Sequence, residues 1–575
     1  MVAWLVVVSI VGLLAILISG VVRSAVAFVS LAGSYLIFGL VSVDVLLMQY
    51  TNPALATLLL LLLVSLALER TPLLDWLSQS LLRGKETMAT ARLMAVTGVL
   101  SAFLNNTAVV AAFLGTITRQ RKIAPSRLLI PLSYASILGG ITTLVGTSTN
   151  LVVNSFAYSN TGRELGVFSF SLVGIPVALL AFVAVLWSAS RLPRNAQQDQ
   201  NEALSYFLAA EVQSGSDLIG KSIEDNNLRN LDGLYLLEIE RGGRLISPVG
   251  PAEVLREGDT LVFTGEVGKV QVLQRFAGLK LFGNAANDLL ATNLVEVVLS
   301  HESELIGKTL QVVDFRSMFD AGVVGIRRGQ KRLEGQLGQI PLRAGDCLVL
   351  AVGNDFQQHR NIERNFHLLS GSFKRPPLSV GKSVLTLGSF ALVIGLAALN
   401  LLPLFHGLLL MLSGLLVARI LTPAELRRRF PFDLWLIIGS ALAIAQGLQS
   451  SGAASLIAQA MQWVTAGNGV YVAFVACYLL TLLLTETVTN NAAAALAFPV
   501  AYTTAQALGA DPMPFIMAVA YGASACFLMP YGYQTHLMVY SSGRYQVKDF
   551  MRAGWPVSVV YSAAVLLITP MVLAF

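Results

Sequence analysis

The chain of 575 residues is long enough for about four ordinary soluble domains, yet hydrophobic residues make up 55% of it and charged residues only 13%. A soluble protein carries about twice that charged fraction. The mean hydropathy of +0.68 and apolar runs of bilayer-spanning length indicate a polytopic α-helical membrane protein, and they exclude a secreted protein, a cytosolic enzyme and a nucleic-acid-binding protein as first interpretations.

The net charge of +6 is distributed unevenly along the chain. Residues 195–373 hold 17 basic and 23 acidic residues, whereas the remainder holds 22 basic and 10 acidic residues. The middle of the chain therefore has the composition of a soluble insert between two hydrophobic halves. The three cysteines lack the spacing of a disulfide framework or a zinc site.

The first half, 1–194, is predicted to cross the membrane five times. Its apolar start resembles a signal sequence, but it lacks a basic beginning and is too long, so we interpret it as a retained helix. The predicted spans are 2–22, 25–47, 53–69, 128–156 and 168–190.

The region 88–118 is predicted to be a re-entrant hairpin rather than a span. Its polar centre, Asn105-Asn106-Thr107, lies where the chain would turn. Positive charges favour the cytoplasmic side, and both flanks of this region are basic, with Arg83, Lys85, Arg92, Arg119, Arg121 and Lys122. Both ends of the hairpin are therefore placed on one side.

The insert contains an internal repeat. GSDLIGKSI (215–223) and LREGDTLVFTG (255–265) match ESELIGKTL (302–310) and LRAGDCLVLAVG (342–353). Two small α/β domains in tandem are predicted, at 203–285 and 290–370. Neither contains a G-x-G-x-x-G strand-turn-helix fingerprint, so no organic cofactor is predicted.

The second half, 378–575, follows the same plan. A hairpin is predicted at 468–505, with a polar centre from Thr485 to Asn491 and no basic flank, so it enters from the outside. Five spans per half is an odd number, so the halves form an inverted repeat, a plan that places the binding site of a transporter near the membrane midplane. The predicted spans are 381–401, 403–420, 431–449, 513–540 and 554–574.

Basic residues predict the orientation. With the insert in the cytoplasm, 21 of the 22 basic residues in the two hydrophobic halves lie on the cytoplasmic side, and only Arg163 lies outside. This asymmetry is typical of a multi-pass protein of the cell membrane with cytoplasmic inserted lobes.

The two hairpin tips carry residues suited to ion binding. Carbonyl groups that end one half-helix attract a cation, and N–H groups that begin the next attract an anion. Neither tip holds Lys or Arg, so bound cations would have to help stabilise a dianion, which is a physical reason for symport. Asn and Thr can also simply cap a helix break, but a matching tip in each half makes that interpretation weaker.

These tips resemble the paired Ser-Asn-Thr motifs of the divalent anion:sodium symporter (DASS) family. GTSTN (146–150) and PYGYQTH (530–536) follow on the next helices, as in that family. The resemblance covers most of both halves and implies an elevator-type homodimer with two sodium sites. It implies sodium ligands at Ser101, Asn105, Asn106, Gly146, Thr485, Val488, Asn490 and Gly532, and substrate contacts at Asn106, Thr107, Thr147, Asn490, Asn491 and Tyr533.

The sequence departs from the family pattern at several of these positions. Asn105 and Thr489 stand where the family has Ser, Asn491 where it has Thr, and Tyr533-Gln534 where it has Thr-Pro. These changes point away from a dicarboxylate and toward the sulfate-transporter-like branch. The insert resembles two RCK C-lobe (TrkA-C) domains, which implies either regulation by a small cytosolic ligand or scaffolding of a dimer.

Three other side chains in the second half have two interpretations each. Glu486 is the one acid deep in this half, so it is either functional or an acceptor for backbone N–H groups. His536 is either a proton carrier or structural. Tyr531 either contacts substrate or packs helices.

The function predicted overall is sodium-coupled symport of a small divalent anion, most of all sulfate, with sodium as the coupling ion and no nucleic-acid partner. The alternatives are a dicarboxylate symporter, an aspartate:alanine-type exchanger and, in a different class, a ligand-gated ion channel. A channel is disfavoured because no TVGYG-like filter is present. An enzyme is not predicted, because the sequence has no pairing of a nucleophile with a base and no metal cluster.

Overall fold

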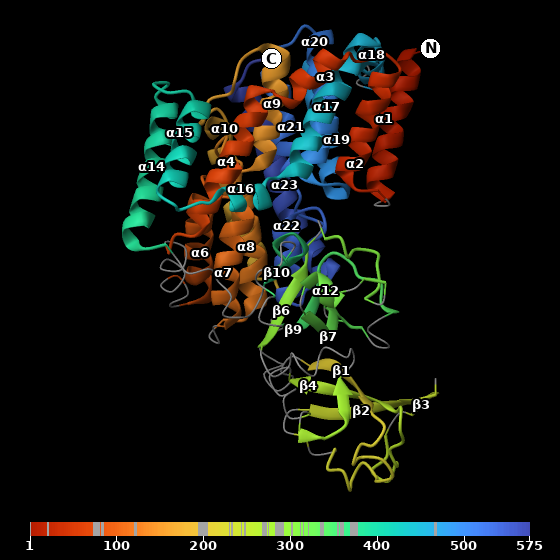
Figure 1. The fold of residues 1–575 in the computed structure, drawn as a ribbon. Coiled ribbons are helices and arrows are strands. Elements are labelled where there is room, and N and C mark those ends of the chain that lie inside the picture. Colours follow the sequence, from red (N-terminus) through yellow and green to blue (C-terminus); the bar gives the residue numbers. More distant parts are fainter. Residues whose placement is uncertain are drawn as a thin grey trace.

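A helical part and two small β-sheet lobes stacked at one end of it make up the structure (Figure 1). Both chain ends lie at the opposite end of the helical part (Figure 1). This computed structural model describes residues 2–19, 22–72, 81, 85–119, 123–193, 205–228, 231, 234–242, 244–246, 249–266, 273, 275–281, 293–300, 303–310, 312–313, 315–319, 321–329, 331–333, 339–352, 356, 362–368, 378–464 and 469–575. Some basic residues used for the orientation lie outside the described residues: Arg83, Arg121, Lys122, Arg194, Lys374 and Arg375.

Length and composition allow 7 helical segments within the described residues to cross a membrane. Four shorter helices are also apolar: α2 (Ser24–Ile37), α7 (Asn106–Arg119), α15 (Leu404–Val417) and α21 (Pro512–Ala523). The long segments are α1 (Val2–Ser19), α3 with α4 (Val43–Glu69), α10 (Ser171–Ala189), α14 (Val380–Ala398), α17 (Phe432–Ser450), α19 (Val470–Thr487) and α23 (Val547–Val572).

The second predicted span, 25–47, is wrong in its extent, because α2 ends at Ile37. Gly39 has a φ of 71°, a conformation that does not continue a helix. The Ser42 side chain then accepts a hydrogen bond from the Val45 N–H and begins α3 (Val43–Tyr50). Asn52 caps α4 (Pro53–Glu69) in the same way.

Four regions contain helix breaks that prove central to the candidate site. The predicted spans 128–156 and 513–540 are each two helices: α8 (Pro125–Gly140) with α9 (Ser148–Thr161), and α21 with α22 (Gln534–Ser542). The predicted hairpins contain α6 (Glu86–Ser101) with α7 (Asn106–Arg119), and α19 with α20 (Asn490–Ala507). The re-entrant topology of these pairs stays a prediction.

The helices pack into two groups. The core group consists of α6 to α10 and α19 to α23, and the outer group consists of α1 to α4 and α14 to α18, which include α16 (Pro423–Arg429) and α18 (Ala453–Val464). Helices α4, α17 and α18 of the outer group pack against α9 and α20 of the core group. Within the described residues, three polar contacts cross this boundary: Ser159 to Gln49 at 3.0 Å, Gln449 to Asn160 at 2.8 Å, and the Asn52 amide to the Ser155 carbonyl at 3.4 Å.

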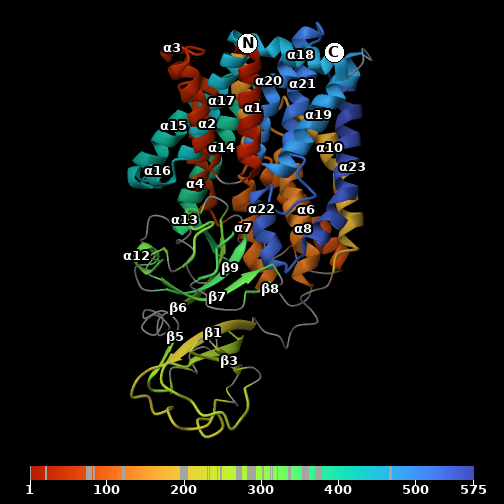
Figure 2. The ribbon, with the colours of Figure 1, turned by 90° about the vertical axis from the view of Figure 1, so that its right-hand side faces the viewer.

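The insert folds into two five-stranded antiparallel sheets, with strand orders β3-β2-β4-β1-β5 and β10-β6-β9-β7-β8. The two orders are the same when the second is read from β8, because β6 to β10 correspond to β1 to β5. Lobe 1 contains β1 (Ser205–Val212), β2 (Leu234–Arg241), β3 (Arg244–Ile246), β4 (Thr260–Glu266) and β5 (Leu279–Leu281). Lobe 2 contains β6 (Asn293–Leu299), α12 (Phe315–Phe319), β7 (Ala321–Arg328), β8 (Lys331–Arg332), β9 (Asp346–Val352), α13 (Ile362–Asn365) and β10 (Phe366–Leu368). Lobe 2 lies between the helical part and lobe 1 (Figure 2).

Each lobe is held together by the same ion pair. The Arg241 guanidinium makes two hydrogen bonds of 2.8 Å to the buried Asp259 carboxylate in lobe 1. In lobe 2, Arg328 bonds Asp346 at 2.6 and 2.8 Å. In each lobe the aspartate also accepts the backbone N–H three residues before it, at 2.8 Å. These matched contacts explain the repeated L-R-x-G-D-x-L sequence.

Candidate functional site

The first helix break brings carbonyl oxygens of two elements together. Helix α6 ends at Ser101 and α7 begins at Asn106. Beside this break, the Thr143 hydroxyl donates to the Ala102 carbonyl, and the Gly146 N–H donates to the Thr143 hydroxyl at 3.1 Å. The backbone between α8 and α9 is thereby held against the end of α6.

Gly146 is the point of closest approach. A Cβ atom at this position would lie 2.6 Å from the Gly140 carbonyl oxygen, 2.8 Å from that of Ser101 and 2.9 Å from that of Ala102. Only glycine fits here, because any side chain would displace these backbone atoms. Three carbonyl oxygens therefore converge on one small volume.

Side-chain oxygens without partners lie in the same region. The Ser101 hydroxyl, the Asn106 Oδ1 and the Asn150 Oδ1 are buried and make no hydrogen bond within the described structure. The Asn150 amide nitrogen donates to the Thr143 carbonyl at 2.8 Å, which leaves its oxygen as the unused atom. Buried polar atoms nearly always have partners, so this oxygen cluster suits a bound cation.

The second break has the corresponding arrangement. The Thr485 hydroxyl, near the end of α19, donates to the Ala523 carbonyl at 2.5 Å, and its oxygen lies 3.0 Å from the Asn490 Oδ1. A Cβ on Gly532 would lie 2.9 Å from the Thr485 carbonyl oxygen. Here the buried atoms without a partner in the described structure include the Asn490 Nδ2, a donor, and the Ser524 hydroxyl, which follows α21. Val488 is also buried, and its N–H donates to the Leu484 carbonyl at 2.8 Å.

Among the described residues, several hydrogen bonds join the two halves at the site, and three of them involve the hairpin tips. The Asn106 Nδ2 donates to the Tyr533 hydroxyl oxygen at 2.6 Å, and the Thr107 hydroxyl donates to the Gln534 Oε1 at 3.0 Å. On the other side of the site, the Ser148 hydroxyl donates to the Asn491 Oδ1 at 3.2 Å. Each hairpin tip thus bonds the beginning of a helix in the opposite half.

These contacts place four helix N-termini together. Helices α7, α9, α20 and α22 begin at Asn106, Ser148, Asn490 and Gln534. Their first two residues take part in each of the three bonds made by the hairpin tips, and Tyr533, the partner of Asn106, immediately precedes α22. Helix N-termini present free N–H groups and a partial positive charge. An anion is the ligand that such a junction favours.

The predicted substrate and sodium residues meet here, with one difference in detail. The Asn105 side-chain oxygen, a predicted sodium ligand, accepts the Thr107 N–H at 2.9 Å, so it caps the break. Thr147 and Tyr533, both predicted to contact the substrate, are joined by a hydrogen bond. Ser148, Asn150 and Gln534 were missed, although Ser148 and Gln534 each follow two residues after a glycine of the predicted sodium sites.

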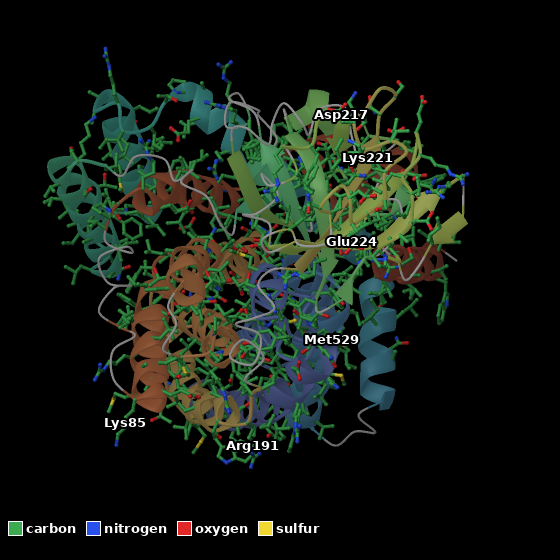
Figure 3. The ribbon with its side chains drawn as sticks, turned by 90° about the horizontal axis from the view of Figure 1, so that it is seen from below. Lys85, Arg191, Asp217, Lys221, Glu224 and Met529 are labelled. Atoms are coloured by element: carbon green, nitrogen blue, oxygen red, sulfur yellow. The ribbon has the colours of Figure 1, made fainter. Side chains whose placement is uncertain are left out.

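Glu486 takes the structural role considered for it. Its carboxylate accepts the N–H groups of Phe527, Leu528 and Met529 at 3.0, 3.0 and 2.9 Å. These residues lie in the break between α21 and α22, so Glu486 holds in place the segment that leads to Gly532 and Tyr533. Seen from the lobe end, Met529 lies beside the lobes and is not covered by them (Figure 3).

His536 is buried in a hydrogen-bonded network. One ring nitrogen lies 2.7 Å from the Cys526 carbonyl oxygen, and the other lies 2.7 Å from the Ser133 hydroxyl. Ser133 in turn lies 2.6 Å from the Thr535 hydroxyl. A neutral ring, which donates to the carbonyl and accepts from Ser133, satisfies every member of this network.

Comparisons with known proteins place these features in context. A family model described as "citrate transporter" matches residues 13–522. The chain is 30% identical over 555 residues to an uncharacterised transporter of Synechocystis, covering 92% of this chain and 90% of that protein. It is 29% identical to a protein named as a putative sulfur deprivation response regulator of Chlamydomonas reinhardtii, over 95% of this chain and 97% of that protein. Sodium/sulfate cotransporter 1 of the same alga is 29% identical over 62% of this chain and 42% of its own length.

Proposed function

Because this chain belongs to the citrate transporter (CitMHS) family, we propose that it is a sodium-coupled symporter of a small divalent anion, with sulfate as its principal substrate. Family membership confirms the transporter family predicted from the paired motifs, and it makes the chain a multi-pass membrane transporter rather than an enzyme. The observation that carries the proposal is the junction of four helix N-termini at the cross-half hydrogen bonds.

The anion is proposed to bind at this junction. The donors are the N–H groups that begin α7, α9, α20 and α22, together with Asn and Thr side chains of both hairpin tips. The unpaired Asn490 Nδ2 is one such donor. Neutral donors arranged around a compact centre suit a tetrahedral oxyanion, which carries acceptor oxygens in every direction.

Sodium ions are proposed to bind on either side of the anion. Near Gly146, the carbonyl groups of Ser101 and Ala102 and the unpaired oxygens of Ser101, Asn106 and Asn150 provide ligands. Near Gly532, the Thr485 carbonyl is the corresponding group. Sodium charge placed there offsets part of the dianion's charge and couples the two binding events.

Asn106 and Asn490 differ in the part that each plays. Asn106 leaves its oxygen unused, which suits sodium, whereas Asn490 leaves its nitrogen unused, which suits the anion. Both were predicted to contact sodium and substrate alike. The hydrogen bonds favour the division proposed here.

Transport is proposed to occur by an elevator-type movement of the core group against the outer group. The site lies wholly within the core group, on two hairpins and two broken helices that would form an inverted repeat with re-entrant hairpins. The few polar contacts between the groups, such as that of Gln49 with Ser159, would exchange during the movement. Broken helices moving as a body past a fixed scaffold are a common form of alternating access.

Sodium is preferred over a proton as the coupling ion. The His536 imidazole lies 5.7 Å from the Tyr533 ring between centroids, and its hydrogen-bond partners are satisfied by the neutral form. The sodium/sulfate cotransporter among the relatives supports the same choice.

The proposed domains are a first membrane repeat at 1–194, two RCK C-lobe-like domains at 203–285 and 290–370, and a second membrane repeat at 378–575. The lobes are proposed to face the cytoplasm of a cell-membrane protein; Lys85 and Arg191 lie at the lobe end of the helical part (Figure 3). A homodimer and a small cytosolic ligand of the lobes complete the proposal.

Uptake of radiolabelled sulfate into proteoliposomes tests the function. An inward sodium gradient should drive uptake that succinate and aspartate do not compete away, and replacement of sodium by choline should suppress it. Molybdate, a tetrahedral dianion, should compete. Sulfate uptake unchanged in choline would refute sodium coupling, and competition by succinate alone would favour the dicarboxylate alternative.

A further inference from the structure

Lobe 2 is attached to the helix that begins at the candidate site. The Arg327 side chain donates to the Ser541 carbonyl of α22 at 3.3 Å, and the Ser541 hydroxyl donates to the Gly345 carbonyl. Helix α22 begins at Gln534, immediately after Tyr533. One short helix therefore connects the lobe to the anion site.

Two glycine turns of lobe 2 pack against the same helix. A Cβ on Gly329 would lie 3.0 Å from the Tyr540 hydroxyl, and a Cβ on Gly345 would lie 3.0 Å from a methyl group of Leu537. Both glycines have positive φ, 58° and 83°. Because neither glycine has a side chain, the backbone of both turns can lie close to α22.

The corresponding turns of lobe 1 do not make such a contact, so it does not follow from the fold that the two lobes share. The corresponding glycines, Gly242 and Gly258, have nothing within 4 Å of an added Cβ. Arg327 precedes the arginine of the repeated ion pair in lobe 2, and Glu240 occupies that position in lobe 1. Among the described residues, these contacts of charge and packing with α22 are made by lobe 2.

The contact is also buried. Arg327 forms an ion pair with Glu296 at 3.6 Å, and the two side chains are only 10% and 15% exposed. Cys347 donates to the same Glu296 carboxylate at 3.1 Å. The arginine that reaches α22 is therefore fixed from inside the sheet.

Lobe 2 has a weaker contact with the outer group. Arg364 of α13 forms an ion pair with Asp433 in the first turn of α17 at 3.3 Å, with side chains 39% and 43% exposed. An ion pair between two such exposed side chains is weakly held in water. Lobe 2 thus bridges the two helix groups, with a buried contact on one side and an exposed one on the other.

We propose that lobe 2 moves with the core group as a rigid extension of α22, and that the Arg364–Asp433 pair is a latch that must open in each transport cycle. This rests on the proposed movement of the core group against the outer group. A lobe held by both groups could not stay attached to both during that movement, and the exposed contact is the one that yields. A ligand or partner that tightens the latch would slow transport without touching the anion site.

Distances between spin labels test which group carries the lobe. Three exposed positions serve: Lys308 in lobe 2, Lys548 at the start of α23 in the core group, and Arg428 of α16 in the outer group. Between sodium-loaded and sodium-free conditions, the Lys308–Lys548 distance should stay constant and the Lys308–Arg428 distance should change. The reverse pattern would show that lobe 2 belongs to the outer group and would overturn the proposal.

The third pair, Lys548–Arg428, reports on the proposed mechanism separately. A change in this distance shows that the two groups move, whatever the lobe does. A constant distance under all conditions would overturn the elevator movement and the latch together, while leaving sodium-driven uptake itself measurable.

Cross-linking tests the latch in the full chain. Arg364→Cys with Asp433→Cys, joined by a bismaleimide, should abolish uptake, whereas each single variant treated with the same reagent should retain it. The double variant before cross-linking should transport at least as fast as the unmodified protein. Full uptake after complete cross-linking would overturn the proposal.

Discussion

Asn106 and Tyr533, separated by 427 positions in the chain, are joined by a hydrogen bond of 2.6 Å from the amide nitrogen to the phenol oxygen. This bond leaves the Asn106 oxygen free to face the carbonyl cluster at Gly146. One amide thus connects the second half of the protein with the proposed sodium site of the first.

Tyr533→Phe should weaken sodium activation of transport. It removes the hydroxyl that orients the Asn106 amide but keeps the ring. Loss of one such bond costs about 1 kcal/mol, so the sodium concentration for half-maximal uptake should rise several-fold with little change in the maximal rate. Sodium titration of uptake measures this, and Tyr531→Phe, on an exposed side chain, is the control. An unchanged sodium requirement would contradict the role given to this bond.

Asn106→Ala and Asn490→Ala should each abolish sodium-dependent uptake. The first removes the free oxygen and the second the free amide nitrogen. If the two residues divide their roles as proposed, residual binding should differ: Asn106→Ala should reduce sodium affinity more, and Asn490→Ala anion affinity more. The rise in unfolding temperature of each variant on addition of sodium alone, or of sulfate alone, measures these two affinities. Normal uptake by both variants, present in the membrane in normal amounts, would remove the site assignment.

Glu486→Gln should destabilise the second half of the site. The carboxylate accepts three backbone N–H groups with both oxygens, whereas an amide offers only one oxygen. Bonds to a charged acceptor are stronger than neutral ones, so the change should cost about 2 kcal/mol and lower the maximal uptake rate. Thermal unfolding and uptake measure these effects, with the exposed Glu164→Gln as the control. Equal unfolding temperatures and equal uptake rates in the two variants would exclude a positioning role for Glu486.

Asp346→Asn and Asp259→Asn form a matched pair that separates the lobes. Each removes the carboxylate of the repeated Arg–Asp pair and should destabilise its own lobe by about 2 kcal/mol. Asp346 adjoins Gly345, whose carbonyl accepts from Ser541, so only Asp346→Asn should also reduce uptake. Equal loss of uptake in both variants would contradict the special attachment of lobe 2.

The native cysteines should be inert toward maleimides in the folded protein. Cys347, Cys477 and Cys526 are all buried. Burial, with the adjacent Glu296 carboxylate, raises the pKa of the Cys347 thiol well above its usual value, so almost no reactive thiolate is present at pH 8. Labelling should be at least about 100-fold slower than in denaturant. Rapid modification of Cys347 would show that lobe 2 opens, and rapid modification of any of the three would require a cysteine-free background for cross-linking.

Much of the framework follows from the sequence, because hydropathy and helix breaking are local properties. Apolar runs indicate membrane helices wherever they occur. The Asn105 side chain caps the start of α7 by accepting the Thr107 N–H, a contact between neighbours in the chain. The internal match around LREGD and LRAGD likewise reflects a turn in which the aspartate accepts the backbone N–H three residues before it.

The breaks in α8–α9 and α21–α22 were harder to predict, because their polar groups are satisfied from elsewhere. The second break depends on Glu486, about 40 residues earlier in the chain. Nothing in the apolar stretch 513–540 itself specifies where such a distant carboxylate will bind. Ser148 and Gln534 were missed for the same reason.

The sequence by itself determined the membrane class, the paired tips and the repeated lobes, since each depends on neighbours in the chain. Only the tertiary structure decided that Thr107 meets Gln534, that Ser148 meets Asn491, and that lobe 2 rather than lobe 1 lies against α22. These contacts join residues hundreds of positions apart, and their formation depends on how whole helices and sheets pack together, a property that no local pattern of residues encodes.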